Sequence, residues 1–238
     1  MNKLRIKILI GVLILLIIVF SADRMFNFYK MALRLFPHEE AVTTVKSFSF
    51  SGKDSLKEWS EKILNGQVSY TVESQEGESY VHAVSDNACS AMYYQIRLDA
   101  SRHPFLSWRW RVAAFPNKTS PEDLSRKGQD DYAARVYVIF PAIFFPKSKA
   151  IEYVWANDAK PGTIVSSPYS PNIKVMVAES GTREGWAEEE RDIYKDYVAA
   201  FGSRPMLAIG AISFMCDSDS TKSKAETFFD DIKIFYKK

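Results

Sequence analysis

The sequence predicts a mainly β fold: an antiparallel β-sandwich or jelly roll with one or two short helices, preceded by an N-terminal membrane helix. About ten short segments rich in β-branched and aromatic residues recur between turn-rich loops. Only one later segment has clear helical spacing, and strands that do not alternate with helices favour antiparallel pairing. A long apolar run near the N-terminus predicts the membrane helix.

The membrane helix is predicted by Ile8–Phe20, in which twelve of thirteen residues are Ile, Leu, Val or Phe. At about −0.3 to −0.6 kcal/mol per residue, bilayer insertion of this run is favoured by about 4–7 kcal/mol. Lys3, Arg5 and Lys7 precede the run, and positive charge before an apolar segment keeps the N-terminus in the cytosol. We therefore expect a single-pass protein of the inner (cytoplasmic) membrane, with its C-terminal domain in the periplasm or outside the cell.

The leader can be read as an anchor or as a cleaved signal peptide. Thirteen residues span about 20 Å of helix, which suits the apolar region of a signal peptide. Cleavage after Ala22, however, would put the bulky Phe20 where a small residue is preferred, and the aromatic residues of segment 25–29 suit the headgroup level. We expect an uncleaved anchor, which N-terminal sequencing starting at Ala22 or Asp23 would contradict.

We divide the chain at Pro37. Residues 1–36 are expected to form the anchor and an amphipathic juxtamembrane segment, and residues 37–238 the β-sandwich domain, which is long enough for a substantial core. With 5 Trp, 12 Tyr and 16 Phe, the chain has more aromatic residues than a small core needs, which leaves some of them for surfaces or clefts. A net charge of only +2 leaves no basic field for nucleic acid.

Strands are predicted where polarity alternates, or where β-branched and aromatic residues gather between turn signals. In chain order the predicted strands are 46–50, 67–73, 80–84, 91–98, 105–113, 132–140, 151–155, 173–179, 206–216 and 227–236. The polar segment 116–131 is a predicted loop. So is the apolar segment 141–149, of which we expect residues 141–146 to be buried against the core.

Two helices are predicted in the exported part. Asp54 stands at an N-cap position, before a short helix that is expected to run to Leu64. The second helix covers residues 186–201 and ends at Gly202. Its apolar face is formed by Trp186, Ile193, Tyr194, Tyr197, Val198 and Phe201.

Two predicted strands divide their side chains between opposite faces. One face of each is apolar: Trp108, Trp110 and Val112 on the first strand, and Ala134, Val136, Val138 and Phe140 on the second. The other faces carry Arg109 and Arg111, and Arg135, Tyr137 and Ile139. A single face with these arginines and Tyr137 would form a floor for a ligand rich in hydroxyls or carboxylates, and a solvated outer face is the alternative.

The cysteines and histidines do not indicate a cofactor. Cys89 and Cys216 would lie in an oxidising space, so they form either a disulfide or two buried free thiols. The three histidines are isolated, and no Cys/His spacing resembles a zinc or haem site. The one metal considered is Ca²⁺, with Asp217 and Asp219 as ligands in an oxygen-rich loop that lacks the EF-hand pattern.

Several motifs follow one another along the chain: LSWRWRV (106–112), DDYAARVYV (130–138), YVWA (153–156), SG (180–181), W-x3-ER-x4-DY-x3-FG (186–202) and D-x-D-x-T (217–221). In this order they resemble the domain of unknown function 3047 family over about residues 48–236. The resemblance implies a bacterial, exported protein and brings no established activity. The segment FFDDIKI (228–234) is also similar to the last strand of galactose-binding-type jelly rolls, common among carbohydrate-binding modules.

The first functional hypothesis is a non-catalytic module that binds carbohydrate or another cell-envelope glycan. Aromatic faces would stack on sugar rings while carboxylates and guanidiniums bond to hydroxyls. The candidate ligand-binding residues are Arg135, Asp131, Trp155, Trp186 and Arg191.

Two alternatives remain open. A glycan hydrolase or lyase would use Asp131 and Glu190 as acid and base, roughly 5–9.5 Å apart. A non-catalytic partner in an envelope complex would make contact through segments 25–36 and 141–146. The sequence contains no nucleophile elbow, HExxH, phosphate loop or dinucleotide fingerprint. An enzyme is favoured only if the polar candidates share one cleft, and otherwise they are local ion pairs.

Overall fold

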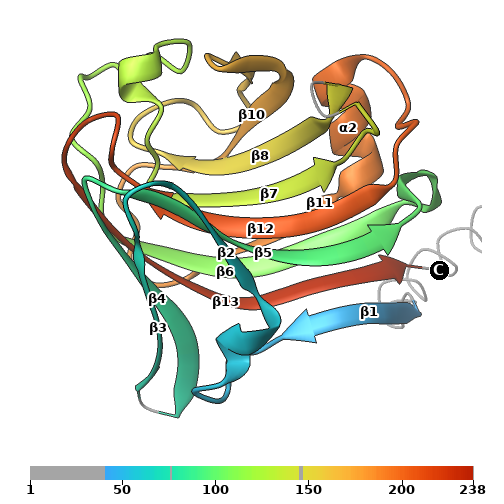
Figure 1. Ribbon diagram of the computed structural model, residues 1–238, viewed down its shortest axis with the longest axis horizontal. Coiled ribbons are helices and arrows are strands. Elements are labelled where there is room, and N and C mark those ends of the chain that lie inside the picture. The colour runs from blue at the N-terminus through green and yellow to red at the C-terminus, as the bar shows by residue number, and fades with distance from the viewer. Residues whose placement is uncertain (1–40, 76, 145–146, 238) are drawn as a thin grey trace, which may run out of the picture. The chain divides into compact units, whose positions relative to one another are not determined.

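Two β-sheets lie face to face in the computed structural model (Figure 1), which describes residues 41–75, 77–144 and 147–237. Residues Val42–Lys238 form one compact unit. The prediction of a mainly β, sandwich-like domain is confirmed. The predicted anchor and juxtamembrane segment, residues 1–36, lie outside the described residues. Within the described part of the chain, no helix is long and apolar enough to cross a bilayer.

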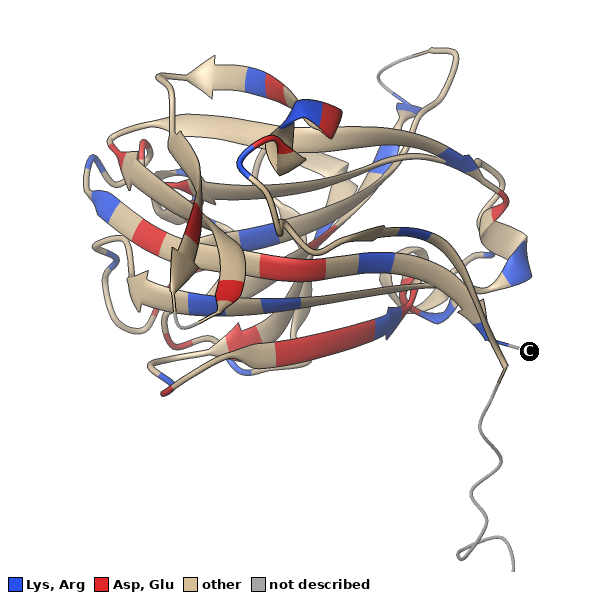
Figure 2. Cartoon of the chain, turned by 90° about the horizontal axis from the view of Figure 1, so that it is seen from below, with Lys and Arg blue, Asp and Glu red and all other residues tan. Residues whose placement is uncertain are grey.

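The first sheet has six strands in the order β11-β6-β13-β4-β3, with β1 also paired to β13. Its pairings are antiparallel. Figure 2 views the molecule from the side of this sheet and shows acidic and basic residues interleaved along the strands. The strands are β1 (Val42–Phe48), β3 (Ser69–Gln75), β4 (Glu78–Asp86), β6 (Pro104–Ala114), β11 (Ala187–Asp192) and β13 (Lys224–Lys237).

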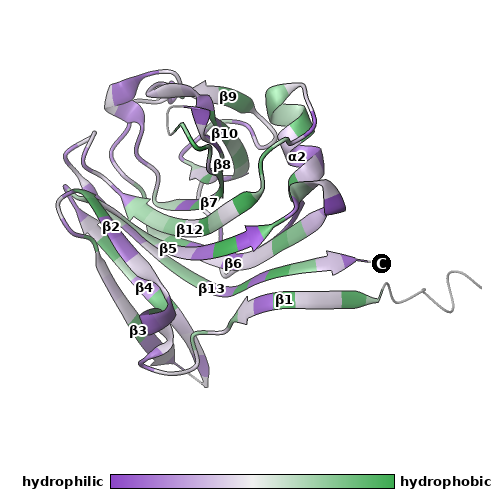
Figure 3. Cartoon of the chain, turned by 45° about the vertical axis from the view of Figure 1, so that its right-hand side comes forward, coloured by the Kyte–Doolittle hydropathy of each residue, from purple (hydrophilic) through white to green (hydrophobic). Residues whose placement is uncertain are grey.

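The second sheet has seven strands in the order β2-β5-β12-β7-β8-β10-β9. Here β10 runs parallel to β8, and the other pairs are antiparallel. Figure 3 shows apolar stretches along its central strands β8 and β12. The strands are β2 (Ser60–Asn65), β5 (Cys89–Leu98), β7 (Ala134–Phe140), β8 (Lys149–Ala156), β9 (Ile164–Ser167), β10 (Ser170–Ser180) and β12 (Ile209–Asp217).

The core between the sheets is built on aromatic side chains. The rings of Trp108 and Trp110 on β6 lie 5.2 Å from Tyr153 and 5.7 Å from Trp155 on β8, respectively. None of these four residues is more than 2% exposed. Burial of such a side chain is worth about 1.5–3 kcal/mol, so this aromatic layer holds the two sheets together. The predicted alternation on β6 and β7 is confirmed.

The helix predicted from Asp54 to Leu64 is wrong beyond its first turn. Ser55–Glu58 form a 3-10 turn, after which the chain extends into β2 and pairs with β5. Helix propensities differ by at most about 0.7 kcal/mol per ordinary residue, and pairing with a neighbouring strand outweighs them here. Leu64, the last residue of the predicted helix, is 60% exposed.

The second predicted helix is correct only in its later half. Helix α2 covers Ile193–Phe201, whereas the preceding residues form the edge strand β11 on β6. The Asp192 side chain accepts a hydrogen bond from the Lys195 N–H at 3.1 Å and caps the start of α2. Gly202 ends the helix with a positive φ of 66°, as predicted.

The two cysteines point to opposite faces of the seven-stranded sheet. Cys89 pairs with Asp217, and Cys216 with Ser90, on the neighbouring strands β5 and β12. Because side chains alternate along a strand, Cys216 enters the core while Cys89 faces outward. Both are buried free thiols, which is the second of the two alternatives that the sequence left open.

Candidate functional site

A hollow of about 360 Å³ lies on the outer face of the seven-stranded sheet, where β12 ends and β7 begins. We call it the β12 pocket. Its charged lining consists of Asp130, Arg135, Glu152, Asp217 and Asp219. Arg135, Glu152 and Asp217 come from the neighbouring strands β7, β8 and β12, and each is at most 3% exposed. The pocket therefore rests on rigid sheet rather than on loops alone.

Arg135 is the centre of this charged cluster. Its Nε donates to Asp217 Oδ1 at 2.8 Å, and Nη2 donates both to Asp217 Oδ2 and to the main-chain carbonyl of Asp130. Nη1 donates to Glu152, and the guanidinium carbon lies 4.6 Å from the centre of the Tyr132 ring. Charge-assisted bonds of this kind are about twice as strong as neutral ones, so they fix the guanidinium firmly.

Burial favours the protonated form of the carboxyl groups in the pocket. Burial raises the pKa of Asp217 to about 8, although the Arg135 guanidinium acts in the opposite direction. Burial raises the pKa of Glu152 as well, again opposed by Arg135. One guanidinium does not neutralise the three carboxyl groups of Asp130, Glu152 and Asp217. The guanidinium therefore offsets the effect of burial on the pKa of Asp217 only in part.

Asp130 carries an unsatisfied acceptor in the pocket lining. The residue is only 8% exposed, and its Oδ1 has no hydrogen-bond partner within the described residues. Its Oδ2 lies 3.7 Å from Arg135 Nη1. A buried oxygen without a donor costs about 1–3 kcal/mol. Asp130 lines the pocket but its Oδ1 exposes less than 1 Å², so a ligand hydroxyl or amine can supply the missing donor once the side chain turns toward the hollow.

The remaining lining is largely aromatic and aliphatic. Tyr169, between β9 and β10, is 58% exposed, and the Lys127 ammonium lies 5.2 Å from the centre of its ring. Tyr137 on β7 and Ile173 on β10 line the hollow, and Leu64 on β2 borders it. An exposed ring beside hydrogen-bonding groups is an arrangement that suits the apolar face of a sugar.

Asp131 lies directly behind the pocket and has a structural role. One carboxylate oxygen accepts the N–H of Ser220 at 3.1 Å, and the other accepts the N–H of Thr221 at 2.6 Å. The side chain thus fastens the loop after β12 to the segment before β7. Asp131 is fully buried, so its predicted role in binding a ligand is wrong.

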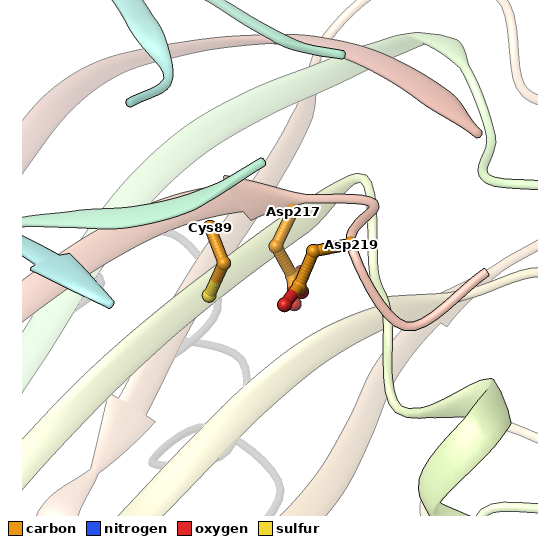
Figure 4. Close-up of side chains that lie close together, drawn as sticks. All are labelled: Cys89, Asp217 and Asp219. Carbon is orange, nitrogen blue, oxygen red and sulfur yellow. The ribbon is translucent and has the colours of Figure 1, made fainter. Parts of the chain in front are cut away.

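Asp217 and Asp219, the predicted Ca²⁺ ligands, do lie together. With Cys89 they each offer one atom within 4.8 Å of the others, on the same side of the sheet (Figure 4). Both oxygens of Asp217 are occupied by Arg135, however, and Asp219 Oδ2 accepts Asn65 Nδ2–H at 2.9 Å. Burial raises the pKa of the Cys89 thiol, which keeps it protonated. Because Ca²⁺ binds six to eight oxygens, these donors do not fit it.

The predicted acid–base pair of Asp131 and Glu190 is wrong. Glu190, on β11, pairs with Lys237 at the end of β13, whereas Asp131 bonds to Thr221 just before β13 begins. A strand of 14 residues such as β13 extends for about 43 Å, at about 3.3 Å per residue. The two carboxylates therefore lie near opposite ends of the fold, far beyond the roughly 5–9.5 Å of a glycosidase pair.

The other predicted ligand-binding residues lie away from the pocket. Trp155 is 1% exposed in the core and donates its Nε1–H to the Gly181 carbonyl, so its faces cannot stack on a sugar. Trp186 is half-buried at the six-stranded sheet, with the Arg109 guanidinium 4.7 Å from its ring. Arg191 is held by Asp196 through two hydrogen bonds of 2.8 and 2.9 Å. The prediction for Trp155 is therefore wrong, whereas those for Trp186 and Arg191 stay predictions for a surface other than the β12 pocket.

The polar floor that the sequence suggested is split between two surfaces. Arg109 and Arg111 lie on β6 of the six-stranded sheet, whereas Arg135 and Tyr137 lie on β7 of the seven-stranded sheet. Since the core faces of both strands point toward each other, their polar faces point in opposite directions. Arg135 is thus the one predicted ligand-binding residue that lines the β12 pocket.

Two important pocket residues were missed by the sequence reasoning. Glu152 stands alone among the apolar residues of β8, and a lone charge in a buried strand is a signal that could have identified it. Tyr169 follows the short strand β9, which was not predicted, so nothing in the sequence placed it beside Asp217. Both depend on the order in which β8, β10 and β9 follow β7 across the sheet.

Solved structures with a similar course of the chain include two carbohydrate-related domains. A family 30 carbohydrate-binding module of a cellulosomal cellulase from Clostridium thermocellum is 10% identical, with a TM-score of 0.41, and the alignment covers 81% of this chain and 98% of that one. The xyloglucanase domain of the effector NopAA from Sinorhizobium fredii is 12% identical, with a TM-score of 0.42, covering 74% and 92%. Likenesses this distant carry no conclusion about what the chain binds.

The comparison with protein families is more specific. No curated protein matches the sequence. The model of the family described as "Protein of unknown function (DUF3047)" matches residues 57–233 of the 238, which include every strand of the β12 pocket. The protein therefore belongs to the DUF3047 family.

Proposed function

We propose that the protein is a membrane-anchored, exported β-sandwich that binds a carbohydrate or another cell-envelope glycan in the β12 pocket. The observation that carries the proposal is the buried, unpartnered Asp130 Oδ1 in a hollow bordered by the exposed ring of Tyr169. This combination provides an acceptor for a hydroxyl or amine beside a surface for a sugar ring.

The charge of the pocket restricts the class of glycan. Four carboxyl groups and one guanidinium line it, and the guanidinium is already bonded to Asp217 and Glu152. Anionic sugars such as uronic acids would place a further negative charge beside them, which is unfavourable. Neutral sugars, which donate through hydroxyls, and amino sugars, which also bring positive charge, fit the free acceptor. We therefore expect neutral or amino sugars to bind more tightly than uronic acids.

Isothermal titration against neutral, amino and uronic oligosaccharides tests the proposal. Asp130→Asn removes the charged acceptor at constant shape, and loss of a hydrogen bond to a charged group, worth about 1.5–3 kcal/mol, weakens binding roughly 10- to 150-fold. Tyr169→Ala removes a stacking contribution of about 0.5–1.5 kcal/mol, or roughly 2- to 13-fold. Glu188→Gln, an exposed change on β11, is the control and leaves affinity unchanged.

Two results would count against glycan binding in this pocket. The first is the absence of detectable binding in titrations against a broad panel of glycans. The second is a ligand whose affinity is the same for wild type, Asp130→Asn and Tyr169→Ala, because such a ligand binds elsewhere on the surface.

A glycan hydrolase or lyase is the second candidate. It is favoured by the raised pKa of Asp217, since a carboxyl group protonated near neutral pH can act as a general acid. The geometry favours binding instead, because Arg135 occupies both oxygens of Asp217. Release of reducing ends from a glycan by wild type, abolished in Asp217→Asn with binding intact, would establish the enzyme.

The exported location is part of the proposal and rests on the apolar run Ile8–Phe20 behind three basic residues. Because both native thiols are buried, accessibility labelling needs an introduced cysteine on the surface, such as Glu184→Cys. In intact cells a label that cannot cross the inner membrane reacts with this cysteine if the domain is exported. Reaction only after cell lysis would place the domain in the cytoplasm.

A further inference from the structure

One end of the sandwich collects apolar and basic side chains that the β12 pocket does not use. At this end β5 finishes beside the start of β12, where Leu98 pairs with Ile209. Here too β7 finishes beside the start of β8, where Phe140 pairs with Lys149. The loop after β7 contacts the start of β12, since a Cβ added at Gly210 would lie 2.4 Å from Pro141 Cγ, and it lines one hollow together with the loop before β12.

Three large apolar side chains are displayed on these two loops. Ile143 is fully exposed, Phe144 is 63% exposed, and Met206 is 82% exposed. Single exposed apolar residues are ordinary, but three on two loops that line one hollow are not. The expectation that segment 141–146 would be buried against the core is wrong for Ile143 and Phe144. They project from the end of the sheet instead of closing it.

The three segments that carry or border these side chains have charges of one sign, and the exposed Asp99 directly follows the first of them. Segments 95–98, 141–149 and 201–208 contain four basic residues and no Asp or Glu. Arg97, Lys147 and Arg204 among them are exposed, and no ion pair joins them to another residue in the described part of the chain. We call this surface the basic end.

The N-terminal leader joins the domain at the same end. A short turn at Ala100–Arg102 links the end of β5 to the start of β6, where Pro104 pairs with Tyr236. The next residue of β13, Lys237, pairs with Val42, the first residue of β1. The chain therefore enters the sandwich at the basic end, and only 21 residues separate Val42 from the apolar run that ends at Phe20.

We propose that the basic end docks on the surface of a lipid bilayer with anionic headgroups, with Ile143, Phe144 and Met206 in the interface. The inference rests on the membrane anchoring proposed above, and it adds a surface through which the folded domain is oriented. Apolar tips supply burial, and each Lys or Arg near an anionic surface contributes about 1 kcal/mol. A hollow of about 770 Å³ at the basic end is lined partly by the basic Arg97 and by Pro141 and Met206, and it can accept a lipid headgroup.

This orientation would decide where the β12 pocket points. Strand β12 runs from the basic end, at Ile209, to the pocket, at Asp217. Its eight steps of about 3.3 Å separate the two by about 26 Å. With the basic end on the bilayer, the pocket lies at the far end of the sheet, open to glycans beyond the membrane surface.

The test uses the full chain, reconstituted through its leader into vesicles. A polarity-sensitive fluorophore is attached to Ile143→Cys, and to Lys160→Cys at the opposite end as the control, while both native thiols stay buried. With phosphatidylglycerol in the vesicles, we expect emission from position 143 to shift to the blue and to be quenched by brominated acyl chains. Position 160 should show neither effect.

Charge reversal separates docking from mere tethering. Lys147→Glu and Arg204→Glu should each lower the ratio of docked to undocked domain at least roughly five-fold, the equivalent of about 1 kcal/mol. Pure phosphatidylcholine should have a similar effect. A water-like signal at position 143 in vesicles that retain the protein overturns the docking proposal alone. If the full chain does not associate with vesicles at all, the proposed membrane anchor is overturned as well. A blue shift without lipid that grows with protein concentration identifies a second copy of the chain as the occupant, and likewise overturns it.

Discussion

Removal of the Arg135 guanidinium tests how the β12 pocket is held together. In Arg135→Met the aliphatic part of the side chain remains, while the hydrogen bonds to Asp217, Glu152 and the Asp130 carbonyl are lost. Removing one partner of a buried ion pair costs about 3–5 kcal/mol, because the remaining charge is uncompensated. Out of a typical total stability of about 5–15 kcal/mol, this is a large fraction.

The loss should depend on pH, which distinguishes charge from packing. Protonation neutralises the abandoned carboxylates, so the deficit of Arg135→Met should be larger at pH 8 than at pH 5. A second change, Asp217→Leu in the same chain, removes one uncompensated charge and should restore part of the stability. Arg183→Met, which breaks an exposed pair with Glu179, is the control and should cost less than about 1 kcal/mol.

Urea unfolding followed by Trp fluorescence measures these differences, since Trp108, Trp110 and Trp155 are buried in the core. A loss for Arg135→Met below about 1 kcal/mol at pH 8 would refute the view that the guanidinium keeps the pocket carboxylates in place. A loss of the same size at both pH values would mean that packing, not charge, is responsible.

Three further outcomes are expected. The pKa of Asp217 is about 8 in the folded chain and near 4 for an unfolded carboxyl group. Because the unfolded chain loses this proton first, the free energy of unfolding should fall between pH 4 and 8, by at most about 1.4 kcal/mol per pH unit. Asp217→Asn should flatten that slope, and an unchanged slope would contradict the assignment. Millimolar Ca²⁺ or EDTA should leave the melting temperature unchanged, since Arg135 and Asn65 occupy the candidate ligands; a rise with Ca²⁺ would contradict this. Thiol titration after denaturation without reductant should find two free cysteines, whereas none would indicate a disulfide between Cys89 and Cys216.

Much of the fold could be predicted from local sequence. Alternation identified β6 and β7 and placed the correct residues in the core, because burial of one face imposes a period of two. The strands β2 and β11 could not be recognised in this way. Both are edge strands with local spacing that favours helix, and their conformation is decided by pairing with β5 and β6.

The candidate site was predictable only in part. Arg135, Asp217 and Asp219 were identified from their polar motifs, but the sequence left open whether they share a cleft with Glu190 and Arg191, which lie on the other sheet. Which polar clusters meet depends on strand order, and β12 pairs with β7 although more than 60 residues separate them in the chain. Spacing along the sequence carries no information about such pairing. The same reason explains why the orphan acceptor on Asp130 became visible only in three dimensions.

The location of a bound glycan tests the central claim most directly. A crystal structure with the tightest neutral or amino oligosaccharide from the titrations should show the sugar in the β12 pocket, with a hydroxyl or amine within hydrogen-bonding distance of Asp130 Oδ1 and a ring against Tyr169. A sugar bound instead on the six-stranded sheet beside Trp186, with an empty β12 pocket, would contradict the account.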